Sequence, residues 1–141
     1  MIETAIARCK HGLLRYPPND MYVGLSLELY GEYSDSEAGF LEQLTRPGQV
    51  VIEVGANIGA HSVHLAKHLG AEGKLICFEP QGALYEILAE NLRQNGCSNA
   101  VAVHGAVGSV PGMIDVPKVD YGQIGNFGGL EVGGNYVVGE S

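Results

Sequence analysis

The stretch "VVIEVGANIGAHS" (residues 50–62) constrains the fold more than any other part of the sequence. Branched aliphatic residues fill positions 50–54 except at Glu53, and a glycine-rich turn follows at once. A short apolar run bounded by glycine predicts a buried strand, here over residues 49–54. The apolar spacing after the turn predicts a helix over residues 58–69. Strand, tight turn and helix in this order indicate a parallel α/β sheet.

The same alternation continues along the chain. Residues 74–79 ("KLICFE") predict a second strand, residues 82–96 a second helix that ends at a glycine, and residues 100–107 a third strand. This βαβαβ order predicts an α/β fold with a Rossmann-like parallel sheet and right-handed crossover helices.

The flanking segments carry weaker patterns. Residues 1–20 show no clear period, and residues 21–33 alternate enough to predict one or two short strands or a hairpin. Residues 34–44 predict a helix that Ser34 or Ser36 could cap. Residues 109–141 are rich in glycine, which predicts a β-hairpin or a long loop.

We expect a single domain, because 141 residues suffice to bury one hydrophobic core. It would comprise an N-terminal cap segment (1–45), a βαβαβ core (46–108) and the tail (109–141). A doubly wound sheet needs further strand–helix units, so we expect the C-terminal half of the fold to be incomplete.

Composition narrows the classes of partner. The net charge is −8, and no cluster of Lys or Arg occurs. A nucleic-acid partner is therefore not expected, because binding the phosphate backbone requires a basic surface. The three cysteines are widely spaced without a CxxC pair, which is typical of reduced thiols in a cytoplasmic protein. No apolar run approaches the ~18 residues of a membrane span.

Three residues mark a ligand site. In an open parallel sheet, ligands bind at the carboxyl ends of the strands. Gly55 and Gly59 let the backbone approach a ligand there. Glu79 ends the second strand, where a carboxylate can accept hydrogen bonds from both hydroxyls of a ribose.

The charge of Glu53 separates two nucleotide-like ligands. The diphosphate of NAD would lie about 4–5 Å from this carboxylate. The repulsion between the two negative charges would cost several kcal/mol at an effective dielectric of about 20. The GxGxxG pattern of a dinucleotide site is also missing. S-adenosylmethionine instead carries an ammonium and a sulfonium, which a carboxylate attracts. We therefore expect S-adenosylmethionine as cofactor, with an NAD-linked oxidoreductase as the weaker alternative.

The segments "VIEVGANIGAHSVHLAK" and "GKLICFEPQGALYEILAENLRQNG" resemble the FkbM family of S-adenosylmethionine-dependent methyltransferases. The resemblance extends over about residues 20–138, and its most specific parts are the "GANIG" turn and the "FEP" strand end. Glu53 replaces the more frequent Asp and keeps the carboxylate. The resemblance implies methylation of an oxygen on a small-molecule or saccharide-like acceptor.

The resemblance also implies a set of cofactor-binding residues. On the methionine side it implies the first strand end and its turn, namely Glu53, Gly55, Ala56, Asn57 and Gly59. On the nucleoside side it implies Glu79 and Pro80 at the ribose and Ala106 near the adenine. Tyr33 and Glu37 would close over the cofactor. From the residues alone, Asn57 is expected to cap the following helix.

The family pattern continues with a strand of the type "KIDVEG", which pairs beside the first strand. We therefore expect this chain to be a truncated member of the family, or a non-catalytic remnant that binds the cofactor or pairs with another chain. The strand at 50–54 would then be an open sheet edge, which invites pairing into a homo-oligomer.

No catalytic or metal-binding residue is assigned. His61, His64 and His68 share one side of a helix, but no carboxylate or cysteine joins them in that helix, so no metal site is expected. His104, Asp120 and Tyr121 could approach an acceptor, yet none has a partner identifiable from the sequence. Packing of His104 and anchoring of a loop by Tyr121 are the favoured interpretations.

Overall fold

The computed structural model describes residues 1–132, and its centre is a three-stranded parallel sheet. The strands β3 (Val50–Val54), β4 (Lys74–Glu79) and β5 (Ala100–His104) follow one another in the order β3-β4-β5. The crossover helices α3 (Ala60–Leu69) and α4 (Gly82–Gln94) connect them. The predicted βαβαβ core is confirmed, although the first helix begins later and the last strand ends earlier than predicted.

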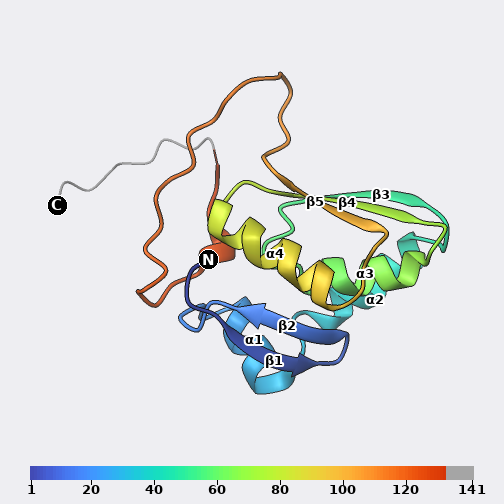
Figure 1. Ribbon diagram of the computed structural model, residues 1–141, viewed down its shortest axis with the longest axis horizontal. Coiled ribbons are helices and arrows are strands. Elements are labelled where there is room, and N and C mark those ends of the chain that lie inside the picture. Colours follow the sequence, from blue (N-terminus) through green and yellow to red (C-terminus); the bar gives the residue numbers. More distant parts are fainter. Residues whose placement is uncertain (133–141) are drawn as a thin grey trace.

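Among residues 1–132, helices cover only one face of this sheet. Figure 1 shows α3 and α4 on the same side of the strands, with the N-terminal elements beyond the helices. On the covered face, Leu75 and Cys77 are fully buried. On the other face, Val50, Ile52 and Val54 are 68%, 62% and 60% exposed. Within residues 1–132, β3 pairs with β4 alone, so it is an edge strand, as expected.

The prediction for the N-terminal segment was incomplete, because residues 1–20 contain a β-hairpin. It consists of β1 (Ala5–Cys9) and β2 (Gly12–Tyr16), paired antiparallel. The edge of β2 that faces away from β1 forms hydrogen bonds with amide side chains of α4. The fully buried Asn91 accepts a hydrogen bond from the Arg15 N–H (2.7 Å) and donates one to the Arg15 carbonyl (3.0 Å). A helix side chain far along the chain supplies these bonds, so no local pattern predicts them.

The strands predicted over residues 21–33 are wrong, because this segment forms helix α1 (Val23–Tyr30). Asp20 lies just before the helix and accepts a hydrogen bond from the N–H of the N-cap residue Tyr22 (3.0 Å), but no side chain caps the helix itself. Val23 and Leu27 lie one helical turn apart and are buried, whereas Tyr30 is 75% exposed. Tertiary packing of this short apolar face overrides its alternating pattern.

The remaining elements agree better with expectation. Helix α2 (Asp35–Leu44) matches the predicted helix; Ser34 stands at its N-cap, but its side chain makes no capping bond. Residues 105–132 form a long loop that returns to the sheet end, with one 3₁₀ turn, η1 (Phe127–Gly129), and no hairpin. The predicted tail from residue 133 onward lies outside the described residues.

Candidate functional site

The carboxylate of Glu79 joins the turns that follow β3 and β4. Its Oε2 accepts a hydrogen bond from the Asn57 N–H (2.8 Å), and its Oε1 accepts one from the Gln81 N–H (2.9 Å). The residue is 4% exposed, and burial raises the pKa of its carboxyl group, although both backbone bonds act in the opposite direction. The sequence predicted the position of Glu79, but it did not predict these two bonds.

The glycine-rich turn has the open backbone that the sequence predicts. Gly55 has φ +75°, and no heavy atom lies within 4 Å of the place where a Cβ would stand. Gly59 has φ +87°, and a Cβ there would approach Leu88 Cδ1 to 2.8 Å, so the turn must pack closely on α4. Only glycine adopts such φ values at little cost.

Asn57 does not cap α3, so this part of the prediction was wrong. The N-cap is Gly59, and no side-chain bond closes the helix start. Asn57 has φ +53°, and its N–H is directed to Glu79 instead. Its side-chain Oδ1 is buried and has no hydrogen-bond partner among residues 1–132. The backbone N–H groups of the first α3 turn thus lack a side-chain cap, as at many anion or ligand sites.

Glu53 lies at the end of β3 and its side chain points toward α3. Its Oε2 accepts a hydrogen bond from the Ser62 hydroxyl (2.6 Å) and lies 3.6 Å from the Cys77 thiol. Burial raises the pKa of Glu53, whereas the bonds from Ser62 and Cys77 and the nearby His61 lower it. No bond to Oε1 is present among the described residues.

The two cap residues implied by the resemblance meet the helix start beside Glu53. His61 Nε2 lies 3.1 Å from Glu37 Oε2, and the rings of Tyr33 and His61 are 5.7 Å apart. The structure therefore brings Tyr33 and Glu37 to His61, which lies in the first turn of α3 and close to Glu53. The sequence pattern pointed to His61 only as a possible metal ligand and did not predict this contact.

A segment of the tail closes over the end of β4. Gln81 is buried, donates a hydrogen bond to the Phe127 carbonyl (2.7 Å) and accepts one from the Tyr121 hydroxyl (2.8 Å). A Cβ at Gly128 would overlap the side-chain amide of Asn57, so this backbone passes directly against the glycine-rich turn. Tyr121 is a loop anchor, as favoured from the sequence. Gln81 was missed, because its partners lie about forty residues away.

Fewer contacts join the residues expected on the nucleoside side of the site. Ala106 is exposed two residues beyond β5, and no described contact joins it to Glu79. The Pro80 carbonyl accepts a hydrogen bond from His104 Nε2 (3.1 Å) if that nitrogen carries the proton. His104 also stacks on Tyr85 at a ring distance of 5.2 Å, which agrees with the packing role favoured for it.

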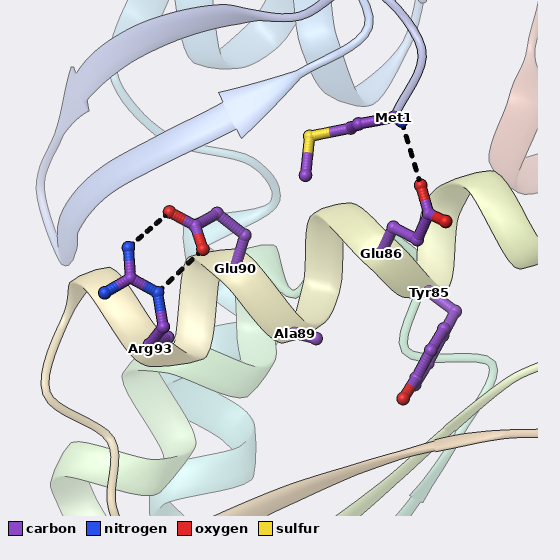
Figure 2. Close-up of a pocket in the computed structure, with 6 residues that line it drawn as sticks. All are labelled: Met1, Tyr85, Glu86, Ala89, Glu90 and Arg93. Carbon is purple, nitrogen blue, oxygen red and sulfur yellow. Dashed lines mark hydrogen bonds and ion pairs between the residues drawn. The ribbon is translucent and has the colours of Figure 1, made fainter.

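One open depression lies away from the expected cofactor-binding residues, on the outer side of α4. Figure 2 shows its lining: Met1, Tyr85, Glu86, Ala89, Glu90 and Arg93. The N-terminal ammonium pairs with Glu86 (3.5 Å), and Arg93 pairs with Glu90 (2.7 Å). None of the expected cofactor residues contributes to it.

Within residues 1–132, no group of three or more His, Cys, Asp or Glu residues is arranged to hold a metal ion. No helix in the same range is long and apolar enough to cross a membrane.

Comparison with known proteins identifies methyltransferases. No family model matches the sequence. The protein-L-isoaspartate O-methyltransferase of Methanothermobacter thermautotrophicus is 37% identical over 59 residues, which are 42% of this chain and 27% of that protein.

Two solved structures share the fold over 72% of this chain. Trm5b from Pyrococcus abyssi has a TM-score of 0.57 at 21% identity, with 28% of its own chain covered. TYW2 from M. jannaschii, solved in complex with AdoMet, has a TM-score of 0.55 at 18% identity, with 42% covered. This chain therefore spans less than half the length of each relative. Its architecture is the Rossmann-like α/β fold of class I methyltransferases.

Burial of Glu53 leads to a prediction about stability. A carboxyl group whose pKa is higher in the folded than in the unfolded chain makes stability fall as pH rises above the unfolded value, which is 4.5 for Glu. We expect Glu53→Gln, which keeps an acceptor for Ser62, to raise the midpoint of urea denaturation at pH 7. The difference from wild type should disappear below about pH 4. A variant less stable than wild type at pH 7 would show that burial of the ionised carboxylate does not destabilise the folded protein.

Proposed function

We propose that residues 1–141 form a single S-adenosylmethionine-binding domain of an FkbM-type methyltransferase, acting on an oxygen of a small-molecule or saccharide-like acceptor. One observation carries the proposal. Glu53, the open turn at Gly55 and the ribose candidate Glu79 converge at the carboxyl ends of two adjacent parallel strands. This is the place where open α/β sheets bind nucleotide-like ligands.

The chemistry of these residues fits the proposed cofactor. Each oxygen of an ionised carboxylate has two acceptor sites, so Glu79 retains one on each oxygen for a ribose hydroxyl. Gly55 leaves open space in which a ligand can approach the backbone. Glu53 retains Oε1 for the ammonium of the methionine end. When bound, the cofactor would supply an activated methyl group on its sulfonium.

The tail segment has to move for this binding. Glu79 is 4% exposed, and Gln81 beside it holds both Tyr121 and Phe127. A ribose can reach the carboxylate only if this cover shifts outward. Tyr33 and Glu37 would then close the methionine side, and Ala106 would border the adenine. We assign no catalytic base, because no described side chain is placed against an acceptor.

Two further proposals concern the setting of the domain. The alternative is a non-catalytic remnant that binds the cofactor or pairs with another chain through the open edge of β3. A cytoplasmic location is consistent with three free cysteines, of which Cys77 and Cys97 are buried. The curated relative reported above is an O-methyltransferase, and TYW2 was solved with AdoMet. The carboxylate of Glu53 remains unfavourable to a diphosphate, which disfavours the oxidoreductase alternative.

The proposed function is tested by calorimetry. We expect the protein to bind S-adenosylhomocysteine and not NAD. Glu79→Gln should weaken S-adenosylhomocysteine binding at least about tenfold, because its amide cannot accept all the bonds that the carboxylate accepts. Glu90→Gln on the outer side of α4 is the matched control and should bind like wild type. Binding of NAD, or unchanged affinity in Glu79→Gln, would refute the assignment.

The open edge supports a proposal about assembly. We propose that β3 pairs with β3 of a second copy, because its outer backbone groups are free within residues 1–132 and its flanking side chains are apolar. Sedimentation should show association that increases with concentration. Ile52→Lys places a charge on this edge strand and should shift the protein to monomer. A wild-type protein that stays monomeric at high concentration would contradict the pairing.

A further inference from the structure

We propose that Ser62 and Cys77 are positioning residues that fix one oxygen of Glu53, so that its other oxygen is presented to the ammonium group of the methionine end of the cofactor. The inference rests on the proposed function and deepens it. It assigns roles to two buried side chains that the cofactor itself would not contact.

The geometry places both donors on the same oxygen. Ser62 lies in the first turn of α3 and donates to Glu53 Oε2 at 2.6 Å. Cys77 lies directly opposite Glu53 in the β3–β4 register, and its thiol lies 3.6 Å from that oxygen. Both residues are 0% exposed. Two elements packed against β3 thus hold Oε2, and no described donor holds Oε1.

Burial limits the alternative partners of the Ser62 hydroxyl and keeps the Cys77 thiol protonated. The Ser62 hydroxyl has no access to water, so the carboxylate is the acceptor it retains apart from the helix backbone. Burial raises the pKa of the Cys77 thiol to about 12, so the thiol stays protonated near neutral pH and can donate to Oε2. This thiol is a poor nucleophile for the same reason.

The two bonds also affect the charge of Glu53. Burial raises the pKa of this carboxyl group, and the bonds from Ser62 and Cys77 counteract that effect. A protonated Glu53 would have no charge to attract an ammonium. The positioning residues therefore orient the carboxylate and favour its ionised form together.

A ligand pair separates this role from a merely structural one. S-adenosylhomocysteine carries the ammonium, whereas 5′-methylthioadenosine keeps the adenosine and the sulfur but lacks the amino-acid end. We expect Ser62→Ala to weaken S-adenosylhomocysteine binding by about tenfold, the usual scale for a hydrogen bond to a charged group. Binding of 5′-methylthioadenosine should change by less than about twofold.

Further variants keep the test decisive. Cys77→Ser keeps a donor and should retain the wild-type ligand preference, whereas Cys77→Ala should shift it in the same direction as Ser62→Ala. If thermal denaturation shows that Ser62→Ala is not folded, the two Cys77 variants provide the comparison of ligand preference. In Ser62→Ala, the pH at which S-adenosylhomocysteine affinity is half lost should also move upward.

The outcomes are distinguishable from failure of the proposed function. If wild type binds neither ligand, the proposed function and this assignment are both refuted. If wild type binds S-adenosylhomocysteine but the variants lose both ligands equally, or lose neither, only the positioning role is refuted.

Discussion

The hydrogen bonds of Glu79 are the interaction on which the geometry of the site depends. One carboxylate accepts the backbone N–H groups of Asn57 and Gln81, so it fixes the turn after β3 against the turn after β4. Gln81 in turn holds the tail at Tyr121 and Phe127. The strand end, the glycine-rich turn and the tail therefore form one connected unit. A ligand that bonds to Glu79 would act on all three at once.

The sequence predicted the parts of the fold that local patterns determine. Apolar runs and flanking glycines predicted β3, β4, β5 and both crossover helices, because each buries a regular face. The hairpin β1–β2 was missed, since the buried Asn91 of α4 supplies bonds to its edge. The helix α1 was predicted as strands, because its alternating residues carry a short helical face as well.

The candidate site was predictable in position and not in detail. Glu53, Gly55 and Glu79 follow from where parallel strands end. The partners of these residues come from distant segments, so the contacts made by Ser62, His61 and Gln81 required the structure. Asn57 is the clearest example. Asparagine favours helix caps, but here it has a positive φ and its N–H donates a hydrogen bond to Glu79. Among residues 1–132, the face of the sheet opposite α3 and α4 is uncovered, with Val50, Ile52 and Val54 exposed.

The central claim is that a nucleoside with a methionine end binds where β3 and β4 end. Amide chemical shifts of the ¹⁵N-labelled protein during titration with S-adenosylhomocysteine test it most directly. The account predicts changes concentrated at Gly55, Asn57 and Gln81 and along residues 121–129, where the cover over Glu79 has to move. Changes confined to the outer side of α4 around Glu86, or no saturable change at all, would contradict it.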